Sequence, residues 1–226
     1  MTDQLLSPPL VVRDLGRMAY SVAWDLQRDL VARRFEGQEE DTLLFVEHDP
    51  VLTAGRGSQK GGEQEGPLPF ELFEVERGGE MTYHGPGQIV VYPIVHLAED
   101  ARDLHRWMRC LEQACITAMA GFGLDCSRKE GATGVWTADG LRKLSSIGVA
   151  ARRWVTWHGM AVNHQTDLDA FQSIRPCGFS PEVMTSMEAE LGEDCPSREM
   201  VVSALSSTLA EDLASFRFGG LRHVES

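Results

Sequence analysis

Positive charge is scarce in this sequence. Its 226 residues carry 21 Lys and Arg against 34 Asp and Glu, a formal net charge of −13. Because nucleic-acid binding depends on a basic surface, this balance argues against a nucleic-acid partner. Apolar runs are short as well: none approaches the roughly 20 residues that span a bilayer, and the N-terminal stretch lacks a signal-peptide pattern. We therefore expect neither a membrane protein nor a secreted one.

Paired cysteines and nucleotide motifs are also lacking. The cysteines are five in number, and they form no C-x-x-C or Cys/His zinc pattern. Neither the dinucleotide fingerprint nor the phosphate loop is present. These absences predict a reduced, cytoplasmic protein with no metal and no nucleotide cofactor. Four of the thiols are interpreted as small buried hydrophobes, namely Cys110, Cys115, Cys126 and Cys195.

The elements that are present indicate one globular α/β or α+β domain over residues 1–226, with a mixed sheet flanked by helices. Apolar residues at helical spacing predict a helix of about 18 residues with Met18, Val22, Leu26 and Leu30 on its buried face. Further helices are expected over 104–122 and 197–213, the last capped by Ser197. Strands are predicted over 42–47, 88–95, 134–137, 144–150 and 155–163, and a mobile surface loop over 55–67.

Polar and glycine residues are densest over 77–88, which reads R-G-G-E-M-T-Y-H-G-P-G-Q. Its four glycines allow a close approach of backbone to a ligand, although a turn could require them for geometry alone. Two further residues stand out. Lys143 starts a strand-like run, where a solvated charge is the usual interpretation. Cys177 lies between a proline and a glycine, where it is either a structural cysteine or an accessible nucleophile with a pKa lowered by a nearby cation.

Taken together, these clusters resemble the lipoyl(octanoyl) transferases, which share a fold with biotin and lipoate protein ligases. The resemblance rests on ordered blocks over 47–56, 77–94, 143–148, 158–163 and 167–178, followed by Thr185-Ser186. It covers most of the chain. Leu52 and Ala54 depart from the family pattern, which has an aromatic residue and a leucine there.

The resemblance implies transfer of an octanoyl group from acyl carrier protein to a lysine on a lipoyl domain, such as that of a 2-oxoacid dehydrogenase E2 subunit or the glycine cleavage H protein. Cys177 would be the nucleophile, and Lys143 would favour the thiolate and then act as acid and base. No cofactor is implied. The implied substrate-binding residues are Arg77, Gly78, Gly79, Glu80, Met81, Thr82, Tyr83, His84, Ser146, Ile147, Gly148, Gly159, Met160 and Ala161. His158 has either a pocket role or a structural one.

Three other functions stay open at this point: an ATP-dependent lipoate or biotin protein ligase, a cysteine hydrolase, and a non-catalytic acyl-binding module. The net charge also poses a docking question, because acyl carrier proteins are acidic. One candidate basic surface is Arg102, Arg106 and Arg109 on a helix. The other is the set Arg128, Lys129, Arg142, Lys143, Arg152 and Arg153 around the strand of Lys143.

Overall fold

A seven-stranded mixed sheet forms the centre of the protein. The computed structural model describes residues 10–58, 68–173 and 181–217. The strand order is β1-β2-β6-β10-β9-β8-β7, with β1 parallel to β2 and the remaining neighbours antiparallel. The bounds are β1 Leu10–Met18, β2 Asp41–His48, β6 Gln88–Ile94, β7 Cys126–Lys129, β8 Ala132–Thr137, β9 Lys143–Arg152 and β10 Val155–Asn163.

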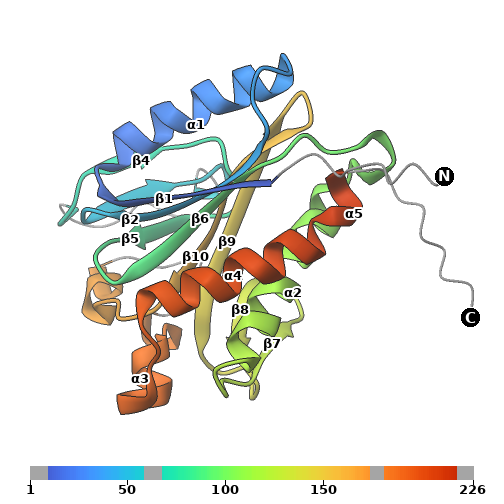
Figure 1. Ribbon diagram of the computed structural model, residues 1–226. Coiled ribbons are helices and arrows are strands. Elements are labelled where there is room, and N and C mark those ends of the chain that lie inside the picture. The colour runs from blue at the N-terminus through green and yellow to red at the C-terminus, as the bar shows by residue number, and fades with distance from the viewer. Residues whose placement is uncertain (1–9, 59–67, 174–180, 218–226) are drawn as a thin grey trace, which may run out of the picture.

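A smaller sheet, in the order β4-β3-β5, lies beside the large one. Its strands are β3 Val51–Ala54, β4 Leu72–Glu74 and β5 Met81–His84. The helix α1 (Tyr20–Phe35) covers one face of the large sheet, and α2 (Leu104–Ala120) and α4 (Arg198–Asp212) cover the other (Figure 1). Short helices complete the chain: α3 Met187–Leu191, α5 Ala214–Arg217, and 3-10 turns at Glu99–Ala101, Leu168–Ser173, Pro181–Val183 and Gly192–Asp194.

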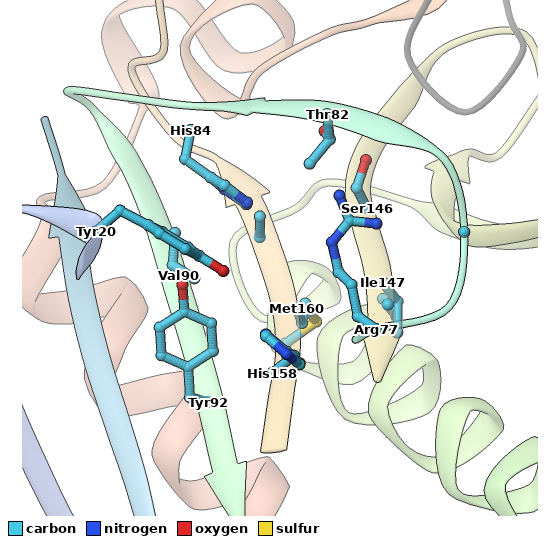
Figure 2. A pocket seen from close by; sticks show the side chains of 14 residues that line it. Tyr20, Arg77, Thr82, His84, Val90, Tyr92, Ser146, Ile147, His158 and Met160 are labelled. Atoms are coloured by element: carbon cyan, nitrogen blue, oxygen red, sulfur yellow. The ribbon is translucent and has the colours of Figure 1, made fainter. Parts of the chain in front are cut away.

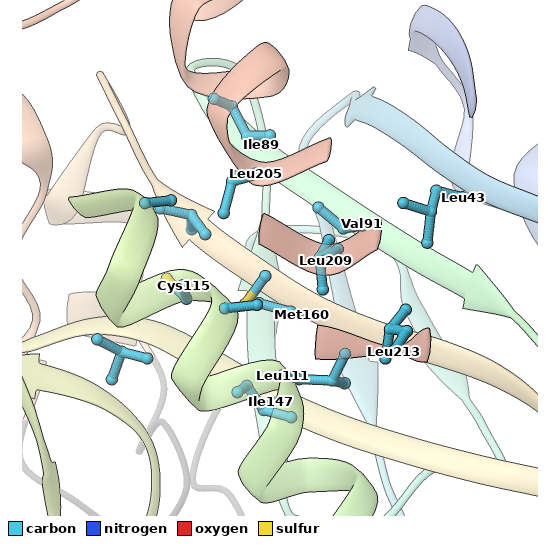
Figure 3. Packing of buried hydrophobic residues seen from close by; sticks show 14 of the residues in the cluster. Leu43, Ile89, Val91, Leu111, Cys115, Ile147, Met160, Leu205, Leu209 and Leu213 are labelled. Carbon is cyan, nitrogen blue, oxygen red and sulfur yellow. The ribbon is translucent and has the colours of Figure 1, made fainter. Parts of the chain in front are cut away.

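Side chains of the central strands point alternately to the two faces of the sheet and contribute to two hydrophobic layers. Leu43 and Phe45 on β2 point to the layer that contains α2 and α4, whereas Leu44 and Val46 point to the layer under α1. This is the two-residue period of a strand that is buried on both faces. Figure 3 shows the first layer, where Leu209 of α4 packs near Val91 of β6. The sheet is therefore a rigid floor on which a site can be built.

Most of the predicted long elements are confirmed. The α/β class and the mixed sheet are correct, the five predicted strands are present, and α2 ends at the expected glycine. Ser197 caps α4 through its hydroxyl, which accepts a hydrogen bond from the Met200 peptide N–H at 3.4 Å. No helix within the described ranges is long and apolar enough to cross a membrane.

The predicted buried face of the first helix is only partly correct: Leu30 is buried and Leu26 packs partly buried against the core, but Val22 does not. Met18 ends β1, the helix begins at Tyr20, and Val22 is 57% exposed. The buried positions are instead Tyr20, Ala23, Gln27, Leu30 and Val31. Because the polar residue Gln27 lies in the middle of this face, a hydrophobicity pattern does not reveal which residues of the helix are buried. Most of the predicted 55–67 loop falls outside the described residues.

Five short strands were not predicted: β1, β3, β4, β5 and β7. The difference matters most for Thr82, Tyr83 and His84, which lie in the glycine-rich run 77–88, where no strand was predicted. They form β5 and pair antiparallel with β3, with His84 opposite Val51. Pairing to a distant strand decides this conformation, and the sequence of 81–84 carries no strong strand signal of its own. The side chains of β5 are thereby fixed in alternating directions.

Candidate functional site

A cavity that is partly open to solvent lies on the α1 side of the large sheet. Its floor comes from β9 and β10, its roof from β5 and the segment before it, and its side from Tyr20 and Tyr92 (Figure 2). Most of the implied substrate-binding residues line it, namely Arg77, Gly79, Thr82, His84, Ser146, Ile147, Gly148, Gly159, Met160 and Ala161. His158 lines it as well.

Four of the implied residues lie outside the lining: Gly78, Glu80, Met81 and Tyr83. Tyr83 instead packs on Phe171, with ring centres 5.4 Å apart, in a separate small core. Three lining residues had no assigned role, namely Tyr20, Val90 and Tyr92. Tyr20 belongs to α1, which none of the quoted sequence blocks includes, so no sequence signal pointed to it.

Glycines at two positions of the cavity wall allow neighbouring segments to approach each other closely. A side chain at Gly159 would meet the Val91 carbonyl oxygen at 2.2 Å, so only glycine lets β10 lie this close to β6. A side chain at Gly148 would meet the Gly78 carbonyl oxygen at 2.8 Å. The segment before β5 therefore crosses directly over β9, and its Gly78 N–H donates to the Val149 carbonyl at 3.0 Å. This crossing forms the roof.

Lys143 is the first residue of β9 and is only 1% exposed. Its ammonium nitrogen lies 5.6 Å from the centre of the Trp136 ring on β8, a cation–π arrangement. Its carbonyl oxygen accepts a hydrogen bond from the Thr185 N–H at 3.0 Å, and Met184 pairs with it in a short parallel bridge. The side chain is thus held at the end of β9, three residues before Ser146 in the cavity.

The second residue of the implied catalytic pair, Cys177, lies outside the described residues, as do its neighbours at 174–180. The chain on both sides of it is described. Phe171 is fully buried against Tyr83, and Met184 pairs with Lys143. The residues before and after Cys177 in sequence are therefore anchored beside β5 and at Lys143.

Buried hydrogen bonds connect the roof of the cavity to its floor. Arg77 donates from Nη2 to the Thr53 hydroxyl oxygen at 2.8 Å. That hydroxyl lies 3.3 Å from His84 Nε2, and His84 Nδ1 lies 2.7 Å from Gln88 Oε1. Because Gln88 uses its NH₂ group elsewhere, its oxygen must accept from the Nδ1–H of His84. His84 Nε2 is then the acceptor of the Thr53 O–H.

The same network continues to Lys143. Gln88 donates from Nε2 to Asn163 Oδ1 at 2.9 Å, and Asn163 donates from Nδ2 to the Thr185 carbonyl at 2.9 Å. Thr185 N–H in turn bonds the carbonyl of Lys143. Because His84 donates from Nδ1 to Gln88 and accepts at Nε2 from Thr53, this network fixes the tautomer of His84. We call this network the buried relay; its members are Arg77, Thr53, His84, Gln88, Asn163 and Thr185.

Burial keeps the histidines around the cavity neutral. It lowers the pKa of His84 to about 3, with the neighbouring His48 adding to the effect, and it lowers the pKa of His48 to about 4. Burial, together with the charge of Arg77, lowers the pKa of His158 to about 3. A neutral His84 with both ring nitrogens bonded cannot exchange protons with a substrate at neutral pH. Its role in this arrangement is to hold its neighbours in place.

His158 has an unusual backbone conformation, with φ at 55°. Its peptide N–H donates to Gln27 Oε1 at 2.9 Å, and its ring stacks on Trp157 at 4.4 Å between centres. Its Nε2 atom lies 3.7 Å from Glu76 Oε2 and has no hydrogen-bond partner in the described part of the chain. The backbone of His158 is thus held by Gln27 and its ring lines the cavity, while a role in binding substrate stays a prediction.

The two candidate basic surfaces are not continuous patches. Arg109 and Arg128 both bind the buried Glu112, at 2.7 and 3.1 Å, and Arg142 binds Glu190 at 2.9 Å. Arg152 lies at the other end of β9 from Lys143, about 30 Å away at the rise of a strand. Arg109, Arg128 and Arg142 are thus paired with carboxylates, and Arg152 is separated from Lys143 by the length of β9.

Comparisons with known proteins agree with this geometry. The family model of the lipoyl protein ligase A/B catalytic domain matches residues 19–210. An octanoyltransferase of Geobacter metallireducens is 44% identical over 83% of this chain and 86% of its own. The bipartite lipoate protein ligase of Thermoplasma acidophilum is 19% identical with a TM-score of 0.70, over 96% of this chain and 88% of that chain. The biotin protein ligase of Aquifex aeolicus in complex with biotin and ATP is 12% identical with a TM-score of 0.55, over 93% and 73%. The last two show a shared fold.

Proposed function

The chain belongs to the octanoyltransferase family, octanoyl transfer is its reaction, and we propose that the reaction runs through a thioester on Cys177. The donor would be octanoyl-acyl carrier protein. The acceptor would be a lysine of a lipoyl domain, such as that of a 2-oxoacid dehydrogenase E2 subunit or the glycine cleavage H protein, in the cytoplasm. One observation carries the proposal: a buried lysine begins β9 three residues before Ser146 of the cavity lining, and the chain leading away from Cys177 is bound to its carbonyl at Thr185.

In the first half-reaction, the Cys177 thiolate attacks the thioester carbonyl carbon. The carbon–sulfur bond to the carrier breaks, and the departing thiolate takes a proton from the Lys143 ammonium. In the second half-reaction, the amine of the acceptor lysine attacks the acyl-enzyme, Lys143 takes a proton from that amine, and Cys177 leaves as thiolate. One lysine acting first as acid and then as base closes the cycle without a net proton change on the enzyme.

The cavity would hold the alkyl chain. Its walls include Ile147, Met160, Val90 and the small residues at 148, 159 and 161. Each buried CH₂ group contributes about 0.8 kcal/mol of binding free energy. A thioester is already an activated acyl group, so a transferase of this kind requires no separate activation step. The ATP-dependent ligase remains the nearest alternative because the fold is shared with such ligases.

The test is acylation of the purified protein by octanoyl-acyl carrier protein, followed by intact mass measurement. We expect an octanoyl adduct that hydroxylamine removes and that is absent in Cys177→Ala. Lys143→Ala should slow adduct formation at least about a hundredfold, because it removes the acid and the charge beside the nucleophile.

Lys129→Ala is the matched control. Its ammonium also lies over the Trp136 ring, at 4.3 Å, but it belongs to β7. This variant should form the adduct at the normal rate. An adduct that persists in Cys177→Ala would contradict the nucleophile assignment. Octanoylation of a lipoyl domain from free octanoate and ATP would support the ligase, and rapid release of octanoate to water would support a hydrolase.

A further inference from the structure

The cavity has a polar side chain at each end. Figure 2 shows Ser146 and Thr82 toward one end and His158 toward the other. Ser146 pairs across the strands with Ala161, which lies three residues from His158 on β10. At the rise of a strand this separation is about 10 Å. This separation between the Ser146 and His158 ends is close to the length of an extended eight-carbon acyl chain.

Three polar atoms at the His158 end are buried without a hydrogen-bond partner among the described residues. They are His158 Nε2, Gln27 Nε2 and Glu76 Oε2. His158 is 2% exposed and Gln27 is fully buried. The two residues are linked, because the His158 N–H donates to Gln27 Oε1, and Glu76 Oε2 lies 3.7 Å from His158 Nε2. We call these three side chains the polar end.

A second cavity, also partly open to solvent, lies next to the polar end. Glu76 lines it, together with Ala150 and Trp157, and Trp157 stacks on His158. Ala150 follows Gly148 on the same face of β9. The two cavities thus lie in line along β9, and the Glu76 and His158 side chains stand between them.

We propose that the polar end sets the acyl-chain length by stopping the chain at eight carbons. This inference rests on the proposed octanoyl transfer. A shorter chain leaves apolar wall uncovered and loses binding energy with each missing CH₂ group. A longer chain would press methylene groups against buried polar atoms that have no hydrogen-bond partner among the described residues, and apolar contact with such atoms returns less free energy than contact with an apolar wall. The optimum lies where the methyl end just reaches His158.

The experiment compares octanoyl- and dodecanoyl-acyl carrier protein as competing donors, with the two adducts on Cys177 resolved by mass. Glu76→Ala removes the side chain between the cavities and lets a longer chain continue into the second one. We expect the dodecanoyl-to-octanoyl ratio to rise about tenfold or more, the effect of removing one such unfavourable contact. Glu74→Ala is the matched control, since Glu74 is exposed on β4 two residues away.

Glu76→Gln separates volume from charge. The amide keeps a polar wall of the same size, so this variant should retain the wild-type ratio. An unchanged ratio in Glu76→Ala, or an equal rise in Glu76→Gln, would overturn the inference while octanoyl adducts still form. Absence of any octanoyl adduct in the wild-type protein would instead contradict the proposed function, so the two failures are distinguishable.

Discussion

Room for Lys143 is made by a glycine on the neighbouring strand. Gly134 on β8 has φ at 125°, and a side chain there would meet Lys143 Cε at 2.7 Å and the Ser145 carbonyl oxygen at 2.3 Å. Its N–H donates to the buried Glu112 at 3.0 Å, which fixes the peptide. The ladder between β8 and β9 is irregular at this point, between Val135 and Trp136. Position 134 therefore decides where the lysine side chain can lie.

We predict that Gly134→Ala displaces Lys143 and lowers the rate of octanoyl-adduct formation about a hundredfold, since a shift of about 1 Å in a catalytic group can cost that much. Gly131→Ala is the control. It also has a positive φ, 72°, but a side chain there meets nothing within 4 Å. It should cost about 1 kcal/mol of stability with little change in rate. A normal adduct rate in folded Gly134→Ala would contradict the assigned role.

The sequence indicates residues such as Lys143 better than residues such as Gly134. A lysine in a recognised motif has chemistry that its type alone suggests. The effect of Gly134 depends on an irregular pairing between two strands, which no local pattern contains. Thr53, Gln88 and Asn163 illustrate the same limit, because they lie inside the quoted blocks and yet their roles emerge only when three strands meet.

At the scale of elements, the buried relay ties the small sheet to the end of β9. It runs from β3 and β5 through the start of β6 and the end of β10 to Thr185, which bonds Lys143. Two members of the relay, Arg77 and His84, line the cavity. Reversing a single hydrogen bond in the buried relay should therefore shift the position of Lys143 without unfolding the protein.

Asn163→Asp tests this idea with an isosteric change. The introduced carboxylate can still accept from Gln88, but its second oxygen faces the Thr185 carbonyl and repels it. We predict a fall of about tenfold or more in kcat with little change in KM. Because protonation restores the missing donor, the ratio of variant to wild-type rate should rise as pH is lowered from about 8 to 6. Gln113→Glu, an exposed isosteric change on α2, serves as control. A ratio independent of pH would argue against positioning.

Long elements with a sustained hydrophobic pattern could be predicted from the sequence, and the short strands β3 and β5 could not. The helix α2 shows a clear apolar stripe, and Leu111, Cys115 and Met119 on it are buried as expected. In contrast, β3 is four residues long and buried throughout, and β5 begins only two residues after a pair of glycines. Their conformation comes from pairing with each other. The same pairing places Thr82 and His84 in the cavity and Tyr83 outside it.

At the scale of the whole molecule, burial of neutral histidines couples stability to pH. His48, His84 and His158 have folded pKa values of about 4, 3 and 3, against 6.5 in the unfolded chain. Below pH 6.5 the unfolded state binds more protons than the folded state, so the free energy of unfolding decreases as pH falls. The histidine contribution to the free energy of unfolding is complete above the pKa of the unfolded chain, and it decreases until the pH reaches the pKa values of the folded protein.

We predict that each of these histidines lowers stability by about 1.4 kcal/mol per pH unit between roughly pH 6 and pH 4. Urea unfolding at a series of pH values measures the slope. His48→Gln should remove about one third of the histidine contribution to this slope. His105→Gln, a change at an exposed position on α2, should leave the slope unchanged. Equal slopes in His48→Gln and the wild type would contradict the prediction.

The hairpin of β9 and β10 also bears on the order in which the chain folds. Arg153 and Trp154 join these strands with φ at 52° and 64°, the signs of a type I′ turn, and Trp154 is tied to Leu97 by a backbone bond of 2.9 Å. A hairpin has short sequence separations and forms quickly, whereas β6 must wait for β10, about 70 residues later. During synthesis, β6 is therefore made well before its edge can pair with β10. We expect the hairpin to be the event that completes the sheet, and with it the cavity.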